Sequence, residues 1–148
     1  MMSDVSLSID GRRVSVQKGT NILGAAKSIG VNIPHLCFEE RLSPISACRL
    51  CLVEVEGMET LAAACSHPVA EGMIVKTNSA RVKEARRVVL ELILSDHPLD
   101  CLTCEKSGSC QLENYAYELE IPLSRFKGEK SHYPLDESNP FIERDPDK

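Results

Sequence analysis

The sequence predicts an α+β protein in which a small sheet folds over one helix and is followed by a helical region and an extended tail. Three observations carry this prediction: period-two alternation at the start of the chain, helical periodicity after Ser79, and seven cysteines in two groups. We expect boundaries that give three regions, 1–78, 79–121 and 122–148. With 148 residues, 43% of them hydrophobic and none of them Trp, the chain is long enough to bury a core that is mainly aliphatic.

Residues 4–17 predict a β-hairpin because apolar and polar residues alternate on both sides of Asp10-Gly11, a dipeptide that favours tight hairpin turns. Thr20 is the expected N-cap of a short helix that Gly30 ends. Residues 31–49 have no clear period and predict a loop. The sheet is completed by expected strands at 50–55, 60–65 and 73–77.

From Ser79, the expected cap, the pattern favours a helix that ends before Pro98. Its predicted inward face consists of Val82, Ala85, Val89, Leu92 and Ile93. A further helix is expected over 109–119, with Leu112, Tyr115, Ala116 and Leu119 inward. Residues 122–148 are mostly polar, contain four prolines, and predict an extended tail that wraps a partner or leads into further chain.

The composition excludes several classes of function. The net charge of −5, from 17 basic and 22 acidic residues, argues against nucleic acid or an anionic membrane surface as the main partner. No apolar run approaches the ~18 residues of a membrane span, and no signal peptide is visible, so we expect a cytoplasmic protein without direct membrane insertion. The basic cluster Arg81, Lys83, Arg86 and Arg87 is interpreted as a solvated helix face, with docking to an acidic subunit as the alternative.

The seven cysteines point to metal binding. An odd number excludes complete intrachain disulfide pairing, and CxxC spacings in a chain without an export signal favour metal ligation. The first group is Cys37, Cys48, Cys51 and Cys65. The second is Cys101, Cys104 and Cys110, with His97 four residues upstream. Four cysteines in one group, and three with a histidine in the other, make two complete four-ligand sets with no cysteine left over.

The first group has three cysteines in or beside one long loop and a fourth on an expected strand, an arrangement that favours a ferredoxin over a zinc site. Its spacing, C-x10-C-x2-C-x13-C, differs from the plant-type ferredoxin spacing in the first gap. Zinc sites usually show two CxxC pairs, whereas here only Cys48 and Cys51 form one. The alternative is a zinc site of Cys48, Cys51, Cys65 and His67, in a non-redox assembly or interaction module; it leaves Cys37 unused.

Three stretches around these cysteines, 34–37, 47–55 and 64–65, resemble the domain that opens the complex I G-subunit family. That family includes iron-only hydrogenases, NAD(P)-linked formate dehydrogenases and the small diaphorase subunits of NAD-reducing hydrogenases. The resemblance implies a β-grasp ferredoxin fold and a [2Fe-2S] cluster held by Cys37, Cys48, Cys51 and Cys65. Ala47 stands where most members have glycine, for which we expect a small backbone adjustment.

Residues 95–104 and 108–112 resemble the second motif of the same family, which binds a [4Fe-4S] cluster through one histidine and three cysteines. The resemblance implies that His97, Cys101, Cys104 and Cys110 are these ligands. Taken alone, a histidine at this position is more typical of a cap at a helix C-terminus. Cys110 is expected at a helix start, where free N–H groups favour a thiolate cluster.

The resemblance implies a two-cluster electron-transfer component with no catalytic centre of its own. The sequence contains no GxGxxG, P-loop or nucleophile elbow. The implied partners are a flavin-containing NAD(P)H dehydrogenase subunit and a catalytic formate dehydrogenase or hydrogenase subunit, or their complex I-like counterparts. Residues 138–145 are most similar to the formate dehydrogenase branch, followed by the hydrogenase branch.

Overall fold

The structure, a computed structural model, describes residues 4–126 and 132–145. They belong to two compact units, Met1–Val89 and Leu90–Lys148. The expected boundaries after 78 and 121 stay predictions. Within the described residues, no helix combines the length and the apolar character that crossing a membrane requires.

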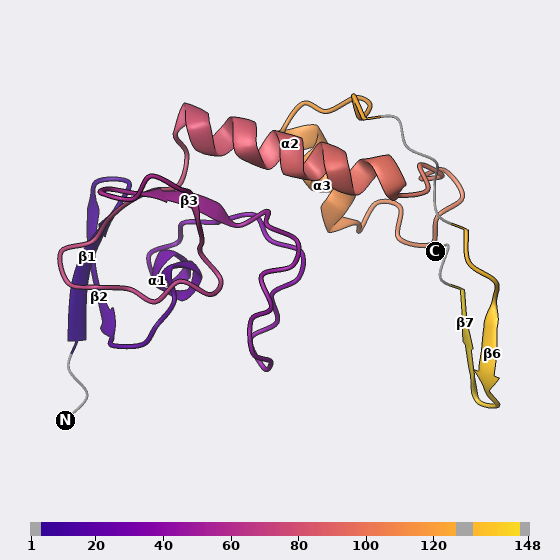
Figure 1. Cartoon of the computed structure of the whole chain (residues 1–148), viewed down its shortest axis with the longest axis horizontal. Helices are drawn as coiled ribbons and strands as arrows, with labels where there is room; N and C mark the ends of the chain where they lie inside the picture. The colour runs from indigo at the N-terminus through magenta and orange to yellow at the C-terminus, as the bar shows by residue number, and fades with distance from the viewer. Residues whose placement is uncertain (1–3, 127–131, 146–148) are drawn as a thin grey trace. The chain divides into compact units, whose positions relative to one another are not determined.

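The first unit holds a five-stranded sheet and one short helix (Figure 1). The strand order is β2-β1-β5-β3-β4, in which β1 and β5 are parallel and the other neighbouring pairs are antiparallel. This order, with a helix between the second and third strands, is that of a β-grasp fold and confirms the predicted class. The elements are β1 (Asp4–Ile9), β2 (Arg12–Gln17), α1 (Ile22–Ser28), β3 (Leu52–Val55), β4 (Ala62–Ala63) and β5 (Ile74–Lys76).

The β1–β2 hairpin forms as predicted. Val5 lies opposite Val16 and Leu7 opposite Val14 in an antiparallel register. Asp10 and Gly11 both have positive φ, 48° and 80°, as the tightest hairpin turn requires. The apolar residues of β1 face a single core made only of residues between Val5 and Val75.

The predicted cap of α1 was wrong by one residue. Asn21, not Thr20, is the N-cap, and its side chain accepts a hydrogen bond of 2.7 Å from Gly24 N–H. Asn and Thr are both good caps, so the sequence alone did not separate these neighbours. The end of the helix is confirmed, because Gly30 follows the C-cap Ile29 with φ of 73°.

Helix α2 (Ala80–Asp96) begins and ends as predicted, but its buried face differs. Ser79 Oγ accepts from Val82 N–H at 3.3 Å, and the helix ends before Pro98. Of the predicted inward residues, Val82 is buried and Ala85, Val89 and Ile93 are half-buried, whereas Leu92 is 51% exposed. The buried stripe follows four-residue steps. That stripe consists of Val82, Arg86, Leu90 and Leu94.

The burial of Arg86 corrects the interpretation of the basic cluster as a solvated face. Its side chain is 5% exposed, and Nε and Nη2 both donate to the carbonyl of Leu52, at 3.1 and 2.7 Å. A count of apolar residues misses this position because an arginine is buried only when a specific acceptor is present.

The second unit contains α3 (Gln111–Glu118) and a hairpin of β6 (Asp136–Asn139) and β7 (Ile142–Arg144), drawn in yellow in Figure 1. Tyr115 is buried on α3, while Leu112, Ala116 and Leu119 are half-buried, as predicted. The hairpin was not predicted, since the sequence indicated only an extended tail. The tail residues 127–131 and 146–148 lie outside the described residues.

Candidate metal centre

The first four cysteines lie around one end of the β-grasp unit. Cys37 and Cys48 occupy the predicted loop between α1 and β3 and are half-buried. Cys51 directly precedes β3, and Cys65 follows β4 two residues after its last residue. Both are only 1% exposed. Two half-buried thiols on a loop therefore accompany two fully buried thiols at the sheet.

The start of α1 holds the Cys65 segment in place. The first N–H groups of a helix have no partner within the helix. Here Ile22 N–H donates to the carbonyl of His67 and Leu23 N–H to that of Ala64, both at 3.0 Å. The Asn21 side chain adds a third contact, from Nδ2 to the Cys65 carbonyl at 2.8 Å. The donors at the start of α1 and the carbonyl groups around Cys65 therefore serve as hydrogen-bond partners for each other.

Cys51 and Cys65 are tied together by the β3–β4 ladder. Leu52 pairs with Ala63, and Ala64 N–H donates to the Cys51 carbonyl at 3.0 Å. Burial raises the pKa of the Cys51 thiol to about 12, and the Cys65 thiol contributes to the rise. A thiolate at Cys51 therefore requires a positive metal centre to stabilise its charge.

Cys37 and Cys48 form a second neighbouring pair. Cys48 N–H donates to Cys37 Sγ at 3.4 Å. Burial alone would raise the pKa of the Cys48 thiol. Backbone hydrogen bonds, from Leu50 first and then from Leu36 and Cys37, outweigh burial and leave this pKa below its ordinary value. These hydrogen bonds favour the thiolate form of Cys48.

The loop that carries Cys37 and Cys48 has local backbone strain on either side of Cys48. Ser46 and Arg49 have φ of 54° and 55°. This left-handed backbone conformation costs free energy in residues other than glycine. Ala47, which stands at the family's usual glycine position, does not have a positive φ. Ser46 Oγ lies 3.3 Å from Cys65 Sγ, so this turn brings a hydroxyl to a buried thiol.

This donor set fits a two-iron cluster. In a [2Fe-2S] centre each iron takes two thiolates, and the side-chain contacts group the thiols as Cys37 with Cys48 and Cys51 with Cys65. Within residues 4–126 and 132–145, no three His, Cys, Asp or Glu side chains converge as a site for one metal ion.

The second set lies on the loop between α2 and α3. His97 directly follows α2, and Cys101 and Cys104 are exposed on a succession of short turns. Cys110 is the N-cap residue of α3, which confirms its predicted place at a helix start. Lys106 N–H donates to Cys104 Sγ at 3.4 Å. Four soft or borderline donors with a nearby N–H group suit an iron–sulfur cluster.

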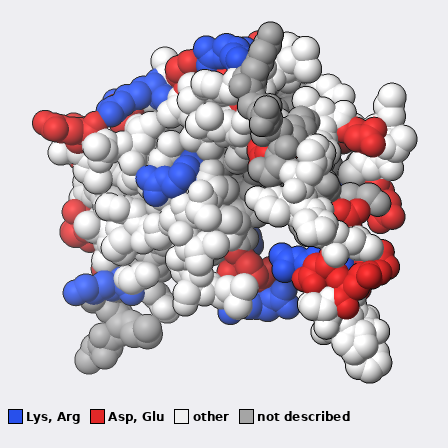
Figure 2. All heavy atoms as spheres, turned by 45° about the vertical axis from the view of Figure 1, so that its right-hand side comes forward, with Lys and Arg blue, Asp and Glu red and all other residues white. Residues whose placement is uncertain are grey.

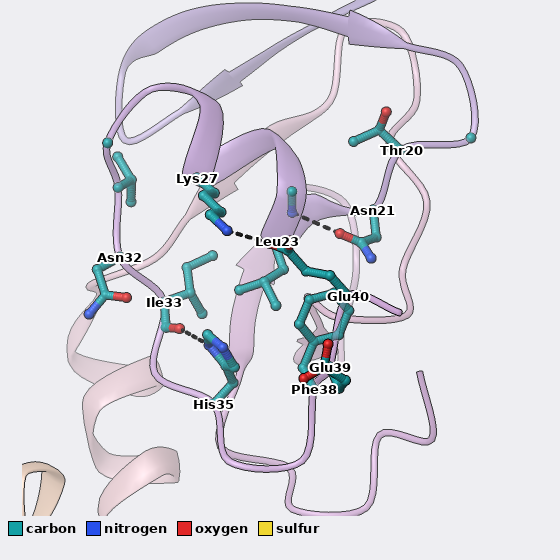
Figure 3. A pocket seen from close by; sticks show the side chains of 14 residues that line it. Thr20, Asn21, Leu23, Lys27, Asn32, Ile33, His35, Phe38, Glu39 and Glu40 are labelled. Atoms are coloured by element: carbon teal, nitrogen blue, oxygen red, sulfur yellow. Dashed lines mark hydrogen bonds and ion pairs between the residues drawn. The ribbon is translucent and has the colours of Figure 1, made fainter. Parts of the chain in front are cut away.

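A pocket of about 830 Å³ lies beside the stretch that leads into Cys37 (Figure 3). It is lined from residues 19–27, which include most of α1, and from residues 30–40, and none of its described lining residues is a cysteine. Lys27 reaches Glu40 across it, and His35 Nδ1 lies 2.8 Å from the Ile33 carbonyl. The second contact holds the His35 ring against the backbone of its own loop.

Charged side chains of both signs are interspersed on the face drawn in Figure 2. The chain as a whole carries a net charge of −5. The absence of a nucleic-acid partner stays a prediction.

Sequence reasoning missed two residues that support the first group. Asn21 joins the start of α1 to Cys65, and Arg86 joins α2 to the residue after Cys51. The available signal for Arg86 was its spacing, four residues from both Val82 and Leu90 on one helical stripe. For Asn21 no local signal separated it from Thr20.

Comparisons with known proteins agree with this arrangement. Residues 2–80 match the family described as "2Fe-2S iron-sulfur cluster binding domain". Residues 86–125 match that described as "NADH-ubiquinone oxidoreductase-G iron-sulfur binding region". The two matches divide the seven cysteines as the spacing predicted, four in the first and three, with His97, in the second.

Curated relatives are longer than this chain. The "NADP-reducing hydrogenase subunit HndD" of Solidesulfovibrio fructosivorans is 50% identical over 99% of this chain, which spans 26% of that protein. The "NADH-ubiquinone oxidoreductase 78 kDa subunit, mitochondrial" of Candida albicans is 42% identical over 84% of this chain, which spans 17% of it.

A solved structure shares the architecture. A chain from the "Crystal structure of NAD+-reducing [NiFe]-hydrogenase in the H2-reduced state" matches with a TM-score of 0.84 and 31% identity, over 93% of this chain and 58% of the other. The chain therefore belongs to the family of 2Fe-2S iron–sulfur cluster binding domains, continues into an iron–sulfur binding region of the NADH-ubiquinone oxidoreductase G type, and binds a [2Fe-2S] and a [4Fe-4S] cluster.

Proposed function

We propose that this chain is an electron-transfer module in a multisubunit NAD(P)-linked oxidoreductase. Its [2Fe-2S] cluster is held by Cys37, Cys48, Cys51 and Cys65, and its [4Fe-4S] cluster by His97, Cys101, Cys104 and Cys110. The observation that carries the first assignment is the grouping of the first four thiols into two neighbouring pairs, one of them fully buried. When bound, the clusters supply one-electron chemistry.

The chain's own residues exclude water and stabilise negative charge. Cys51 and Cys65 lie next to the end of the β3–β4 ladder and are each 1% exposed, so water has little access to them. Cys48 N–H and Lys106 N–H each donate to a cysteine sulfur, one in each set. Hydrogen bonds to thiolates favour the more negative reduced state of a cluster.

The names of the relatives support a role within a larger assembly. They are subunits of an NADP-reducing hydrogenase and of a mitochondrial NADH-ubiquinone oxidoreductase. We place the substrate chemistry in other subunits or in further chain, so that this region is not an enzyme on its own. A flavin-containing NAD(P)H dehydrogenase subunit is the proposed electron partner, a hydrogenase or complex I-like assembly the proposed context, and the cytoplasm the proposed compartment. The formate dehydrogenase branch stays a prediction, since neither relative carries that name.

Iron and acid-labile sulfide, measured on anaerobically purified chain, test the proposal. We expect about six of each per chain, from one two-iron and one four-iron cluster. Dithionite reduction should produce two distinct S = 1/2 signals by electron paramagnetic resonance (EPR). Zinc without sulfide would overturn the redox function.

Single substitutions test the ligand sets. Cys51→Ser should leave about four irons per chain and Cys104→Ser about two. The pair Cys37→Ser and His67→Ala separates the cluster from the zinc alternative. In the proposed site only Cys37→Ser removes the first metal centre, whereas a site of Cys48, Cys51, Cys65 and His67 would lose its metal only in His67→Ala.

A further inference from the structure

We infer that Arg86 is a positioning residue for the [2Fe-2S] cluster: it fixes the start of β3, directly after Cys51, and it raises the reduction potential of the cluster. This inference rests on the proposed function and adds to it a residue outside both ligand sets. Arg86 belongs to α2 and lies 34 residues from its partner Leu52 in the sequence.

The Leu52 carbonyl points away from β4. Backbone groups of successive residues in a strand point to opposite neighbours. The Cys51 carbonyl faces β4, where it accepts from Ala64 N–H. The Leu52 carbonyl therefore faces the other neighbour, β5, as does Glu54, which pairs with Lys76 of that strand.

Strand β5 ends before it can donate a hydrogen bond to this carbonyl. Its last residue is Lys76, and the β3–β5 register stops at the Glu54 pair. Leu52 is 8% exposed, so water has little access to its carbonyl. A buried carbonyl without a hydrogen bond would cost free energy. Arg86 supplies the hydrogen bonds that a longer β5 would provide: Nε and Nη2 both donate to the Leu52 carbonyl oxygen, at 3.1 and 2.7 Å.

The hydrogen bonds from Arg86 hold the backbone next to a proposed cluster ligand. Leu52 is the residue directly after Cys51, and Cys51 is itself buried at 1% exposure. One side of this short stretch is held by the β4 ladder and the other by the guanidinium. Arg86 thus limits the movement of the Cys51 sulfur through the backbone that carries it.

Arg86 also contributes a buried positive charge. A guanidinium keeps its proton at all ordinary pH values, and this one is 5% exposed. A buried positive charge acts through a lower effective dielectric than a surface charge. Reduction adds one negative charge to the cluster, so a cation held one residue from a ligand favours the reduced state.

EPR-monitored redox titration of the full chain with both clusters tests the inference. In Arg86→Gln we expect the equilibrium constant for reducing the [2Fe-2S] cluster to fall on the order of tenfold, about 59 mV for a one-electron couple. The [4Fe-4S] potential should be unchanged in the same sample. Lys83→Gln, which removes an exposed charge from the same helix, is the matched control and should leave both potentials at the wild-type values.

Arg86→Lys separates position from charge. Lysine keeps the charge but lacks the planar fork that places two N–H groups on one carbonyl. We expect a potential closer to wild type than that of Arg86→Gln, together with altered visible circular dichroism of the [2Fe-2S] cluster. If Arg86→Gln does not fold, this spectrum alone carries the test, and a wild-type spectrum in Arg86→Lys overturns the inference.

The outcomes distinguish the inference from the proposed function. A wild-type chain without a [2Fe-2S] signal would overturn the proposed function itself. A normal [2Fe-2S] signal whose potential is the same in wild type and Arg86→Gln would overturn only the role of Arg86. A fall in both cluster potentials would also overturn it, because a general loosening of the fold would then explain the effect.

Discussion

Arg125 clamps the carboxylate of Glu91 through three N–H contacts of 2.6 to 3.0 Å. The Glu91 side chain is 1% exposed and the Arg125 side chain 59%. A buried carboxylate on α2 is therefore paired with an arginine that is largely exposed to solvent. Ser124 Oγ adds a hydrogen bond of 2.8 Å to the Glu91 carbonyl. The chain beyond residue 121 is therefore bound to α2 at this point, which the prediction of an extended tail over 122–148 did not include.

Breaking this clamp should destabilise the second unit. Arg125→Met leaves the Glu91 carboxylate buried without its guanidinium, at an expected cost of about 3 kcal/mol, near the lower end for a buried pair because the arginine is partly exposed. Urea unfolding of the cluster-loaded chain measures it. The control is Arg41→Met, since Arg41 and its partner Glu39 are both largely exposed and an exposed pair contributes about 0–1 kcal/mol. Equal midpoints for the two variants would contradict the prediction.

Asn21 is expected to stabilise both α1 and the Cys65 segment. Asn21→Ala removes the helix cap and the donor to the Cys65 carbonyl, and should cost about 1–2 kcal/mol. Asn21→Asp keeps the capping oxygen but loses the donor, so it should unfold normally yet lose the [2Fe-2S] visible absorbance faster. The exposed Asn32→Ala is the control. The assignment fails if Asn21→Asp retains its cluster as long as wild type does.

Arg49→Gly should relieve strain in the cysteine loop. The left-handed backbone at Arg49 costs about 1–2 kcal/mol, which glycine avoids. Part of this stabilisation is lost again, because glycine has more conformational freedom in the unfolded chain and loses more entropy on folding. We expect a net stabilisation of about 0.5–1 kcal/mol in urea unfolding. Arg41→Gly, in the same loop without a positive φ, should be neutral or destabilising. A loss of stability in Arg49→Gly would show that the side chain, not the backbone, matters at this position.

His97→Cys tests the neutral ligand of the second set. A fourth thiolate adds one negative charge to the cluster environment, so the midpoint potential of the [4Fe-4S] cluster should fall, in the direction opposite to histidine ligation in Rieske centres. Redox titration of a variant that retains its cluster measures the change. An equal or higher potential would show that the histidine does not act through its charge.

Removal of the iron should affect the two units unequally. The buried core of the first unit is one cluster of eighteen residues between Val5 and Val75. The described second unit buries only a few side chains, namely Leu90, Glu91, Leu94, Tyr115 and Ile121. After chelation and oxidation, hydrogen exchange should increase strongly over 97–118 and only slightly in β1 and β2. A similar loss of protection in both would show that the β-grasp core also depends on its cluster.

Local patterns were sufficient to predict most elements. The β1–β2 hairpin, the end of α1 at Gly30 and the limits of α2 each depend on neighbouring residues, whose conformational preferences act over a few positions. The inward face of α2 was predicted less well, because Arg86 and Glu91 are buried in place of apolar residues and depend on partners 34 positions away. The β6–β7 hairpin was missed because all its residues are exposed and show no apolar alternation.

By itself the sequence indicated the chemistry: seven cysteines and a histidine at fixed spacings predict two ligand sets, and soft ligands in such numbers favour iron–sulfur clusters or zinc. Only the tertiary structure decided which thiols are neighbours, which are buried, and which residues outside the motifs hold them. The physical reason is that ligand identity is a local property of the chain, whereas burial and hydrogen-bond partners arise when distant segments meet. The pairing of Arg86 with Leu52 exists only because β5 ends before it can cover that carbonyl.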